Sequence, residues 1–305
     1  MGKIAFVFSG QGAQYTGMGK SLCEVSPAAR AVFEMADRIR PGTSEQCFTA
    51  EKAVLSVTAN TQPCLFSVDL AAAEALREAG IAPAAVAGFS LGEIPALAFA
   101  GKLPAEEAFR FVCSRAEAMN RCAERHPGAM FAVLGLSPEQ VEQAAAALPA
   151  CYPVNYNCRT QTVVACAADS AAALSASIKA AGGKAVKLAV SGAFHSPFMQ
   201  DAGDELRAAY AGLSLSESGI PVYANATAAP YDSIDLLFRQ VSSPVLWYKT
   251  VENLCAEGVT VFIEVGAGKT LRGLIGKIAP EATALSVEDA DSLKSTLEVL
   301  QNAQQ

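Results

Sequence analysis

A serine at position 90 has the sequence surroundings of an enzyme nucleophile. The segment Gly88-Phe89-Ser90-Leu91-Gly92 matches the pattern GxSxG, in which a sharp turn between a strand and a helix exposes the serine hydroxyl and small flanking residues let the two elements approach. An apolar strand is expected before it, over 84–89, and a helical run after it. Because a bare match rarely has this context, the pattern predicts covalent catalysis through Ser90 rather than an ordinary serine in a glycine-rich turn.

A serine hydroxyl needs a base whose pKa lies near working pH, and histidine is the usual one. The chain has two histidines. His126 precedes Pro127, which is typical of an exposed turn, whereas His195 lies in a loop after an expected strand, where functional groups of α/β folds concentrate. Taken alone, either would be interpreted as a structural histidine. The serine pattern favours His195 as the base.

Arg115 places a charge on the apolar side of a helix predicted over 104–124. The apolar residues that share its face by helical spacing are Ala108, Phe111, Val112, Met119 and Cys122. No acidic residue lies on this face, so the guanidinium must reach solvent, pair with a carboxylate from elsewhere in the fold or bind a ligand carboxylate. The pattern leaves a structural ion pair and ligand recognition both open.

Two glycine-rich loops look like nucleotide sites but have the wrong spacing. Gly10-Gln11-Gly12-Ala13-Gln14 follows the first strand, yet a dinucleotide fingerprint would need its third glycine where this chain has Tyr15. Gln11 fits a loop that aims a backbone donor at an oxyanion, or a plain turn. Gly268-Lys269-Thr270 looks like the end of a phosphate-binding loop, whose first glycine would fall on Ile263. We expect no nucleotide cofactor.

The elements that carry these residues alternate between strand and helix. The predicted order is a strand over 3–9, helices over 27–39 and 63–79, a strand over 84–89, a helix from Leu91 and the helix over 104–124. Pro63 is expected to open the second of these helices. Apolar strands alternating with helices indicate an α/β fold with a parallel sheet buried on both faces.

The order of elements changes between 128 and 190. We expect a strand over 129–134, a helix over 137–147, strands over 152–157 and 162–167, a helix over 169–181 and a strand over 184–190. This βαββαβ order is ferredoxin-like. The sequence therefore predicts a small subdomain at 126–191, inserted into an α/β core made of 1–125 and 192–305. The second part of that core is expected to hold strands over 221–225 and 260–265 and helices over 197–211, 232–241, 246–257, from Lys269, and over 289–301.

Composition limits the classes of protein to which the chain can belong. Of its 305 residues 51% are apolar and 17% charged, which suits a globular protein with a sizeable core. The net charge of −7, without a run of Lys and Arg, argues against nucleic acid and membrane as partners. The nine cysteines include no CxxC and, with only two histidines, predict a reducing compartment rather than disulfides or a metal site. No apolar run reaches the roughly 18 residues that span a bilayer, so we expect a cytoplasmic protein, and a monomer.

These features together resemble the malonyl-CoA:acyl carrier protein transacylase family, nearly from end to end. The segments that carry the likeness are Phe8-Ser9-Gly10-Gln11-Gly12-Ala13-Gln14, the residues 88–93, Arg115, Pro153-Val154-Asn155-Tyr156-Asn157, Gly192-Ala193-Phe194-His195-Ser196, Gln240 with Ser243-Pro244-Val245 and Trp247, and Glu264-Val265-Gly266-Ala267-Gly268-Lys269. The resemblance implies an α/β-hydrolase-like core carrying a ferredoxin-like insert, in agreement with the domains predicted from pattern.

The resemblance also implies a mechanism. Ser90 would attack the thioester of malonyl-CoA, and His195 would act as base and then as acid, oriented by a backbone carbonyl near Gln240 instead of a carboxylate. The backbone N–H groups of Gln11 and Leu91 would hold the oxyanion, and Arg115 the malonyl carboxylate.

Further substrate contacts are implied for Asn157, Gln240 and Phe194. The loop with Phe194 is similar to the malonyl-selective version, in which a bulky ring narrows the pocket against methylmalonyl. The acyl group would pass to the thiol of an acyl carrier protein in a ping-pong sequence, without cofactor or metal. The product would supply fatty-acid synthesis or, alternatively, a polyketide synthase served in trans.

The chain departs from the family pattern beside the nucleophile. Phe89 replaces a common histidine, Ile94 replaces an aromatic residue, and Pro95 lies in the first turns of the elbow helix, where it removes a donor and is expected to kink it. These residues adjoin the pocket, so the preference for acyl chains is open.

Two rival classes remain to be tested, a serine hydrolase and a noncatalytic module that binds carrier proteins. A hydrolase would need a catalytic acid, but the chain has no Asp-Gly dipeptide, and Asp169, which lies between Ser90 and His195 in sequence, is expected to be the N-cap of a helix. A noncatalytic module would not need Ser90 and His195. For carrier docking, two basic groups are candidates, Lys179 with Lys184 and Lys187, and Lys269 with Arg272 and Lys277.

Overall fold

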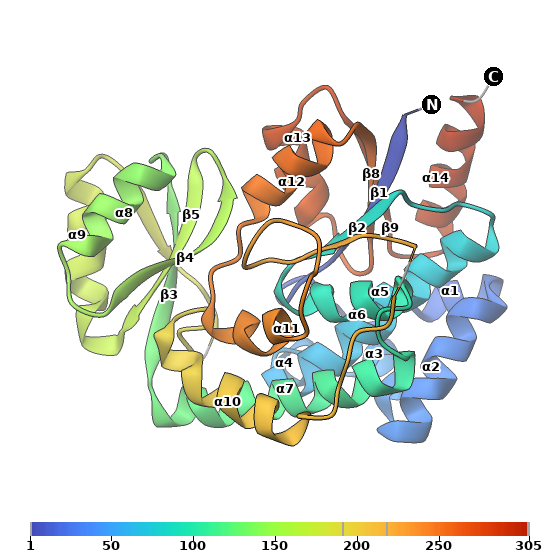
Figure 1. The fold of residues 1–305 in the computed structure, drawn as a ribbon, viewed down its shortest axis with the longest axis horizontal. Coiled ribbons are helices and arrows are strands. Elements are labelled where there is room, and N and C mark those ends of the chain that lie inside the picture. The colour runs from blue at the N-terminus through green and yellow to red at the C-terminus, as the bar shows by residue number, and fades with distance from the viewer. Residues whose placement is uncertain (1, 191, 218, 304–305) are drawn as a thin grey trace.

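Strands rich in apolar residues form the larger of two sheets, which lies near the middle of Figure 1. The computed structural model describes residues 2–190, 192–217 and 219–303. The larger sheet runs in the order β7-β2-β1-β8-β9, with every neighbouring pair parallel. Its strands are β1 (Lys3–Phe8), β2 (Ala85–Gly88), β7 (Val222–Tyr223), β8 (Val259–Val265) and β9 (Thr283–Val287). The prediction of a parallel-sheet core is confirmed.

Helices cover both faces of this sheet because successive side chains of a strand point to opposite sides. Phe6 and Phe8 of β1 belong to one apolar core, and Ala5 and Val7 to another. The helices of the first core are α1 (Lys20–Val25), α2 (Pro27–Ile39), α3 (Thr43–Thr49), α4 (Lys52–Leu55), α5 (Thr58–Glu78), α6 (Glu93–Phe99), α7 (Ala105–Arg125), α10 (Gln200–Ala209), α11 (Asp235–Arg239) and α14 (Ala290–Asn302). Those of the second are α12 (Trp247–Ala256) and α13 (Thr270–Ile278).

The smaller sheet is antiparallel and lies to one side of the larger one (Figure 1). Its strands run in the order β4-β5-β3-β6. They are β3 (Gly128–Leu134), β4 (Cys151–Cys158), β5 (Gln161–Ala167) and β6 (Lys184–Lys187), joined by α8 (Pro138–Ala146) and α9 (Ala171–Ala180). Four antiparallel strands in βαββαβ sequence and in this spatial order form a ferredoxin-like unit. The subdomain boundaries at 126 and 191 stay a prediction, and Ser191 lies outside the described residues.

Backbone hydrogen bonds attach the smaller sheet to the core. Tyr156 in β4 donates its N–H to the carbonyl of Val245 at 2.9 Å, and Val245 donates to Val154 at 2.7 Å. Val245 directly precedes the segment that leads into α12. The segment around Val245 in the larger unit therefore runs along one side of β4, and the pocket described below lies where the two units join.

The elements differ from the predicted ones in a few places. Pro63 does not open α5 but lies inside it, because α5 begins at Thr58. The missing N–H of Pro63 removes one hydrogen bond near the helix start, while most of the helix is buried and held by packing. The edge strand β9 escaped prediction because Thr283–Val287 is half-exposed and shows no clear alternation. The short helices α1, α3 and α4 were also not foreseen.

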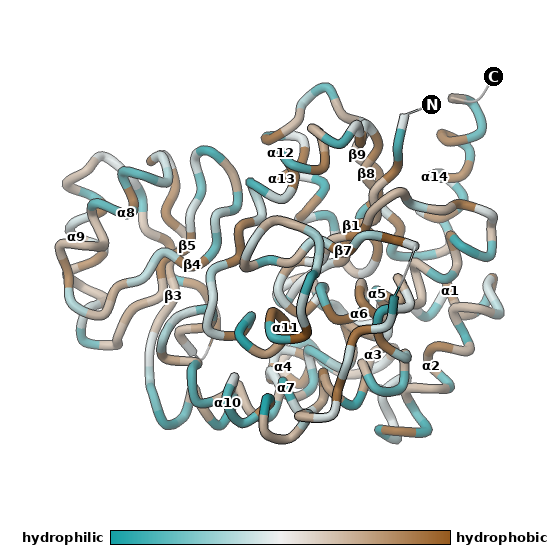
Figure 2. The backbone as a smooth tube through the Cα atoms, viewed as in Figure 1, coloured by the Kyte–Doolittle hydropathy of each residue, from teal (hydrophilic) through white to brown (hydrophobic). Residues whose placement is uncertain are grey.

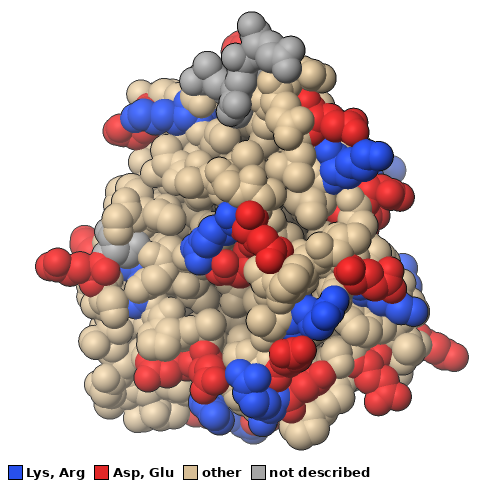
Figure 3. Space-filling view, turned by 90° about the vertical axis from the view of Figure 1, so that its right-hand side faces the viewer, with Lys and Arg blue, Asp and Glu red and all other residues tan. Residues whose placement is uncertain are grey.

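Hydrophobic and charged residues are distributed differently over the molecule. Figure 2 shows hydrophobic stretches concentrated around β1, β8 and β9, and hydrophilic ones in the outer loops. On the face drawn in Figure 3, Lys and Arg lie interspersed with Asp and Glu. In the part of the chain that the structure describes, no helix combines the length and apolarity needed to cross a membrane.

Candidate active site

Ser90 lies at a sharp turn between β2 and α6. Its backbone has a φ of +54°, in the left-handed region, and begins a 3-10 turn over Ser90–Gly92. A Cβ at Gly88 would stand 1.9 Å from the carbonyl carbon of Gly92, and a Cβ at Gly92 would stand 2.4 Å from the carbonyl oxygen of Phe8. Both glycines of the pattern are therefore required by close approach of the backbone, as the elbow geometry demands.

Pro95 does not break this elbow. It is the third residue of α6, in the first turn, where a helical N–H has no partner in its own helix. Phe89, where the family commonly has histidine, packs edge-on against Trp247 with ring centroids 5.6 Å apart. The departures from the family pattern thus leave the turn around Ser90 intact.

His195 faces Ser90 directly. Its Nε2 lies 2.7 Å from the Ser90 Oγ, and its Nδ1 lies 3.0 Å from the backbone oxygen of Gln240. Because a carbonyl only accepts, Nδ1 carries the proton and Nε2 is left to accept the serine hydroxyl proton. The ring is buried, and burial followed by the charge of Arg115 lowers the pKa of His195 to about 4. The histidine is therefore neutral at pH 7 and its Nε2 can accept a proton, although its pKa lies below the value near working pH that was expected of the base.

The backbone carbonyl of Gln240 therefore contacts the imidazole where the resemblance implies an orienting group, and no carboxylate among the described residues supports His195. Asp169 lies in a 3-10 turn over Ala168–Ser170 of the smaller unit. It is not the N-cap of α9 as expected, because Ser170 occupies that position. The other histidine, His126, is exposed and contacts Asp201 at 3.1 Å. The Ser-Asp-His triad of a hydrolase is not formed by the residues that the structure describes.

Arg115 is buried behind the nucleophile, with 1% of its surface exposed. One terminal nitrogen donates to Gln62 Oε1 at 2.7 Å, and the other donates to Gln240 Oε1 at 2.9 Å and to Ser90 Oγ at 3.3 Å. Within the described residues its Nε has no partner and no carboxylate lies within ion-pair distance. Burial lowers the pKa of Arg115 to about 10, so it still carries its charge at pH 7.

Gln240 links the three groups. Its backbone oxygen holds His195, its side-chain oxygen accepts from Arg115, and its Nε2 donates to the carbonyl of Ser90 at 2.7 Å. Gln240 is fully buried. The side chain predicted to contact substrate therefore serves at least to hold Ser90, His195 and Arg115 together.

A pocket of about 570 Å³ opens in front of Ser90 and His195. Of the residues that the sequence predicted, Gln11, Asn157 and Phe194 line it, while Arg115, Leu91 and Gln240 lie behind its surface. The smaller unit and the segment after β6 supply an apolar wall, made of Met130, Ala132, Val163, Leu188 and Val190. Lys269 and Lys277 lie along the α13 side, with Thr270, Gly273 and Leu274 on the same helical face. The cavity therefore has one apolar wall and two lysines on its α13 side.

Gln11 and Leu91 are close to the nucleophile through the packing of two loops. A Cβ at Gly10 would stand 2.7 Å from the carbonyl oxygen of Phe89, so the loop after β1 lies directly against the elbow. No acceptor in the described ranges takes up the backbone N–H of Gln11 or of Leu91. Free donors beside a serine nucleophile are what an oxyanion hole requires.

Four residues of this site were not foreseen. Gln62 holds Arg115, and Asn225, Glu93 and Tyr231 form a buried network against the Ser90 turn. Asn225 is a polar residue at the end of a predicted strand, and Glu93 ends the segment 88–93 that carries the family resemblance, so these two had a usable signal. Gln62 lies inside a buried helix whose sequence gives no hint of its partner.

One group of possible metal ligands occurs among the described residues, namely Cys122, His126 and Asp201. Cys122 is buried and donates its thiol to the carbonyl of Phe198, and the Arg125 guanidinium lies 3.8 Å from Asp201. A cation beside the carboxylate opposes a second cation. We assign no metal to this group.

Comparison with known proteins identifies relatives that are acyl transferases. A family model described as an acyl transferase domain matches residues 5–289. The malonyl CoA-acyl carrier protein transacylase of Bacillus subtilis is 36% identical, with 98% of each chain covered. A transacylase of that name from Clostridium perfringens has a solved structure with a TM-score of 0.95 at 33% identity, covering 99% of this chain and 98% of that one. A malonyl-transacylase solved in complex with the acyl carrier protein of a type II polyketide synthase gives 0.92 at 31% identity, covering 97% and 99%.

Proposed function

The chain belongs to the malonyl CoA-acyl carrier protein transacylase family, and from this premise we propose that it moves a malonyl group from malonyl-CoA to the phosphopantetheine thiol of an acyl carrier protein. The observation that carries the proposal is the buried Arg115, which touches the Ser90 hydroxyl and has only amide and hydroxyl partners among the described residues. A charged guanidinium held this way, beside a nucleophile, fits an acyl group that ends in a carboxylate.

The first half-reaction loads the enzyme. As the Ser90 Oγ attacks the thioester carbon of malonyl-CoA, His195 Nε2 takes the hydroxyl proton, and the backbone N–H groups of Gln11 and Leu91 stabilise the oxyanion. The tetrahedral intermediate collapses by breaking the C–S bond. The proton on Nε2 passes to the departing CoA sulfur, which leaves a malonyl ester on Ser90 and a neutral His195.

The second half-reaction repeats these steps with another thiol. The pantetheine thiol of the carrier protein gives its proton to His195 Nε2 and attacks the ester carbon. Collapse breaks the bond to Ser90, which recovers the proton, and malonyl-carrier leaves. A neutral histidine oriented by a carbonyl serves both halves, because it must gain and return a proton twice in each cycle.

Arg115 would bind the malonyl carboxylate with the part of its guanidinium that has no protein acceptor. Charge-assisted bonds to a carboxylate are roughly twice as strong as neutral ones. Acetyl-CoA would leave the buried charge with amide partners alone. The site is therefore built to prefer a dicarboxylic acyl group.

Phe194 and Asn157 would complete the substrate contacts. Phe194 lines the pocket next to His195, where its ring would narrow the space for the extra methyl of methylmalonyl. Asn157 also lines the pocket, and its buried Oδ1 has no partner among the described residues. An amide of the pantetheine arm would satisfy this oxygen.

Carrier docking is proposed on the α13 side of the pocket. Lys269 and Lys277 line the pocket, whereas Lys179, Lys184 and Lys187 do not. Acidic carrier proteins would be guided by positive charge at the place where the pantetheine arm enters. The α13 cluster is therefore preferred over the one on the smaller unit.

We also propose a compartment, an oligomeric state and a pathway for the protein. The nine cysteines form no disulfide in the described residues, which supports a reducing compartment such as the cytoplasm. The exposed large apolar side chains there are scattered valines, which supports a monomer. The curated relatives named as malonyl transacylases support a role in fatty-acid synthesis, and service to a polyketide synthase is the alternative.

The proposal is tested by transfer with purified protein. Labelled malonyl-CoA, methylmalonyl-CoA and acetyl-CoA are each supplied with a holo acyl carrier protein, and kcat/KM is measured for the three donors. We expect transfer with malonyl-CoA preferred, and water as a poor acceptor. Hydrolysis of the donors without transfer to the carrier would instead identify a thioesterase.

A further inference from the structure

The ladder between β2 and β7 ends in an unusual way beside Ser90. These parallel strands pair Val86 with Val222 and Ala87 with Tyr223. Extending the register by two residues sets position 89 opposite Asn225. In a parallel ladder, the backbone of residue 225 would then donate its N–H to the carbonyl of Gly88 and accept the N–H of Ser90.

The side chain of Asn225 makes these two bonds in place of its backbone. Its Nδ2 donates to the carbonyl of Gly88 at 2.6 Å, and its Oδ1 accepts the backbone N–H of Ser90 at 2.8 Å. The amide group thus has the donor and acceptor of a peptide unit, aimed at the two atoms that a further rung of the sheet would bind. Asn225 is 1% exposed, so solvent does not compete.

The backbone of Asn225 is engaged elsewhere. Its N–H donates to Glu93 Oε2 at 2.5 Å, and its carbonyl accepts from the N–H of Leu246 at 2.9 Å. Glu93 is the first residue of α6 and lies three residues after Ser90. The contacts from Ser90 to Asn225 and from Asn225 to Glu93 therefore close a ring around the elbow.

Tyr231 fixes the far side of this ring by donating its hydroxyl to Glu93 Oε1. Glu93 is fully buried, and its carboxyl has two donors, one from Tyr231 and one from Asn225. Each member holds the next in one orientation. Asn225, Glu93 and Tyr231 are not among the described residues that line the pocket, so the ring acts on the turn and not on the cavity.

We propose that Asn225 is a positioning residue that holds the nucleophile by replacing a rung of the β-sheet with its side chain. The φ of +54° turns Ser90 out of strand geometry, where a backbone rung would not follow it. The longer reach of the asparagine amide keeps the Ser90 N–H bound in the turn, and this fixes the Oγ at 2.7 Å from His195. Asn225 itself does not touch the acyl group.

The test compares Asn225→Ala and Asn225→Asp with the unmodified protein. Loss of the clamp lets the Ser90 hydroxyl shift, and a shift of about 1 Å is enough for a loss of about 100-fold. We expect Asn225→Ala to lower the single-turnover rate of Ser90 malonylation by about 100-fold, with KM for malonyl-CoA changed less than about threefold. Asn253→Ala is the matched control, because Asn253 donates to the carbonyl of Ala228 near the same loop without contacting the elbow.

Asn225→Asp distinguishes the clamp from general damage. Its carboxylate keeps an acceptor for Ser90 N–H but sets a second oxygen against the carbonyl of Gly88. Protonation would restore the donor, and the neighbouring Glu93 and the burial of the site favour protonation. Relative to the unmodified protein at each pH, the Asp variant should regain activity as the pH falls from 8 to 5.5.

Binding measured without chemistry completes the test. Calorimetric titration with malonyl-CoA of Ser90→Ala, and of the same variant carrying Asn225→Ala, should give the same Kd within about threefold. The proposal would be overturned if adding Asn225→Ala to Ser90→Ala weakened the binding of malonyl-CoA by as large a factor as Asn225→Ala alone lowers the rate. Asn225 would then support the pocket as a whole. The proposal would also be overturned if the activity of Asn225→Asp, relative to the unmodified protein, did not change with pH. This measurement decides the question even if Asn225→Ala does not fold. Failure of the unmodified protein to transfer malonyl would instead refute the proposed function.

Discussion

The floor and the rim of the pocket are built in opposite ways. On the floor, Ser90, His195, Arg115 and Gln240 form a connected set, and all but Ser90 are almost completely buried. On the rim, the Lys269 side chain is 58% exposed and its ion-pair partner is Glu288 at 3.2 Å. Charges on the floor act without screening by water, while those on the rim are screened by salt.

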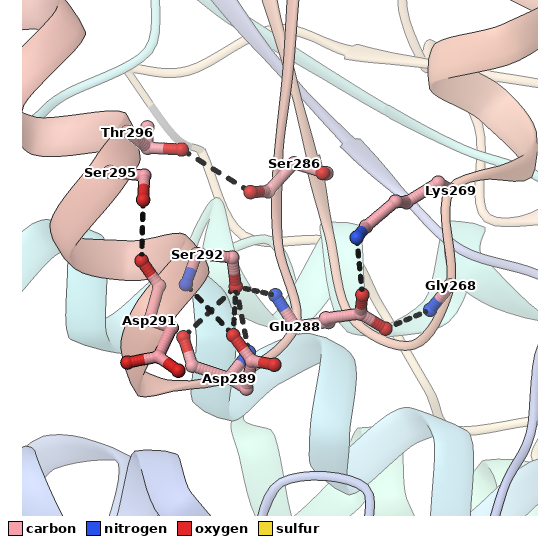
Figure 4. Close-up of polar contacts among 9 residues, drawn as sticks. All are labelled: Gly268, Lys269, Ser286, Glu288, Asp289, Asp291, Ser292, Ser295 and Thr296. Carbon is pink, nitrogen blue, oxygen red and sulfur yellow. Dashed lines mark hydrogen bonds and ion pairs between the residues drawn. The ribbon is translucent and has the colours of Figure 1, made fainter.

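The backbone of the rim is nevertheless fixed by hydrogen bonds. Figure 4 shows Glu288 between the Gly268 N–H, at 3.0 Å, and the Lys269 ammonium. Next to it, Asp289 and Ser292 exchange the hydrogen bonds of a capping box at the start of α14. The loop is thus fixed while the lysine head stays in water. One cavity thus combines a preorganised floor with a rim whose charges act only from a distance.

The largest effect is expected at the nucleophile. Ser90→Ala removes the only hydroxyl that faces His195 in the described structure, so covalent labelling by malonyl-CoA should disappear. Mass spectrometry of the intact protein after mixing with malonyl-CoA measures this. A stable malonyl adduct in the variant would remove Ser90 from the mechanism.

His195→Ala should lower the rate of malonylation by about 100- to 10,000-fold, the usual contribution of a general base. His126→Ala is the matched control, since His126 is exposed and does not line the pocket; the activity of this variant should stay within about twofold. Stopped-flow measurement of CoA release gives both rates. The reverse ranking of the two variants would contradict the assignment.

Arg115→Ala should change the preference among substrates more than it changes the fold. Removing the partner of a buried carboxylate costs about 2–5 kcal/mol, or roughly 30- to 4000-fold in kcat/KM for malonyl-CoA. Transfer from acetyl-CoA should be unchanged or faster. Equal losses with the two donors would show that Arg115 is structural.

The dependence of activity on pH is a smaller but sharper test of the floor. Burial and Arg115 lower the pKa of His195 to about 4, so the base stays neutral as the pH falls from 7 to 5.5. We expect kcat/KM within about twofold over this range, whereas a histidine of ordinary pKa would lose about tenfold. Below pH 4, protonation should remove activity.

A control variant distinguishes the titration of His195 from that of Glu93, which is also buried. Burial raises the pKa of Glu93 to about 7, so the profile is repeated with Glu93→Gln. The same linkage bears on stability, because the unfolded chain protonates His195 at higher pH than the folded one does. The stability that neutral His195 contributes is therefore present above about pH 6.5 and lost as the pH falls toward 4. An apparent pKa near 6.5 that persists in Glu93→Gln would contradict the buried base.

The smallest effect is expected at the rim. Reversing Lys269 and Lys277 to Glu should raise the KM for the carrier protein by up to about fivefold at low salt and less at high salt. Lys179→Glu with Lys184→Glu is the matched control on the smaller unit. If neither pair changes KM at any salt concentration, docking does not use these lysines.

How much of this the sequence could predict depends on the range of the contacts. GxSxG and its flanking elements are local, and the apolar stripe around Arg115 reveals a buried charge within one helix. The partners of these groups are not local. Ser90 and Asn225 are 135 residues apart in the sequence, and Arg115 and Gln240 are 125 apart. The periodicity of these segments does not indicate which residues pair.

The fold shows the same division. The βαββαβ order of the smaller unit follows from alternating patterns, and so does the central strand β1. The start of α5 was predicted wrongly at Pro63, because burial of the helix outweighs the loss of one hydrogen bond. The strand β9 was not predicted, because an edge strand has only a weak alternation of apolar and polar residues. The family resemblance supplied Gln240 and Leu91, which pattern alone did not reach.

The position of the apolar wall has an evolutionary consequence. The groups proposed to carry the chemistry all come from the larger unit, whereas Met130, Ala132 and Val163, which form the side of the pocket, come from strands of the smaller one. Substitutions in those strands can reshape the cavity without moving Ser90 or His195. Acceptance of a new acyl chain can therefore be selected through changes in the smaller unit while the reactive groups of the larger unit stay unchanged.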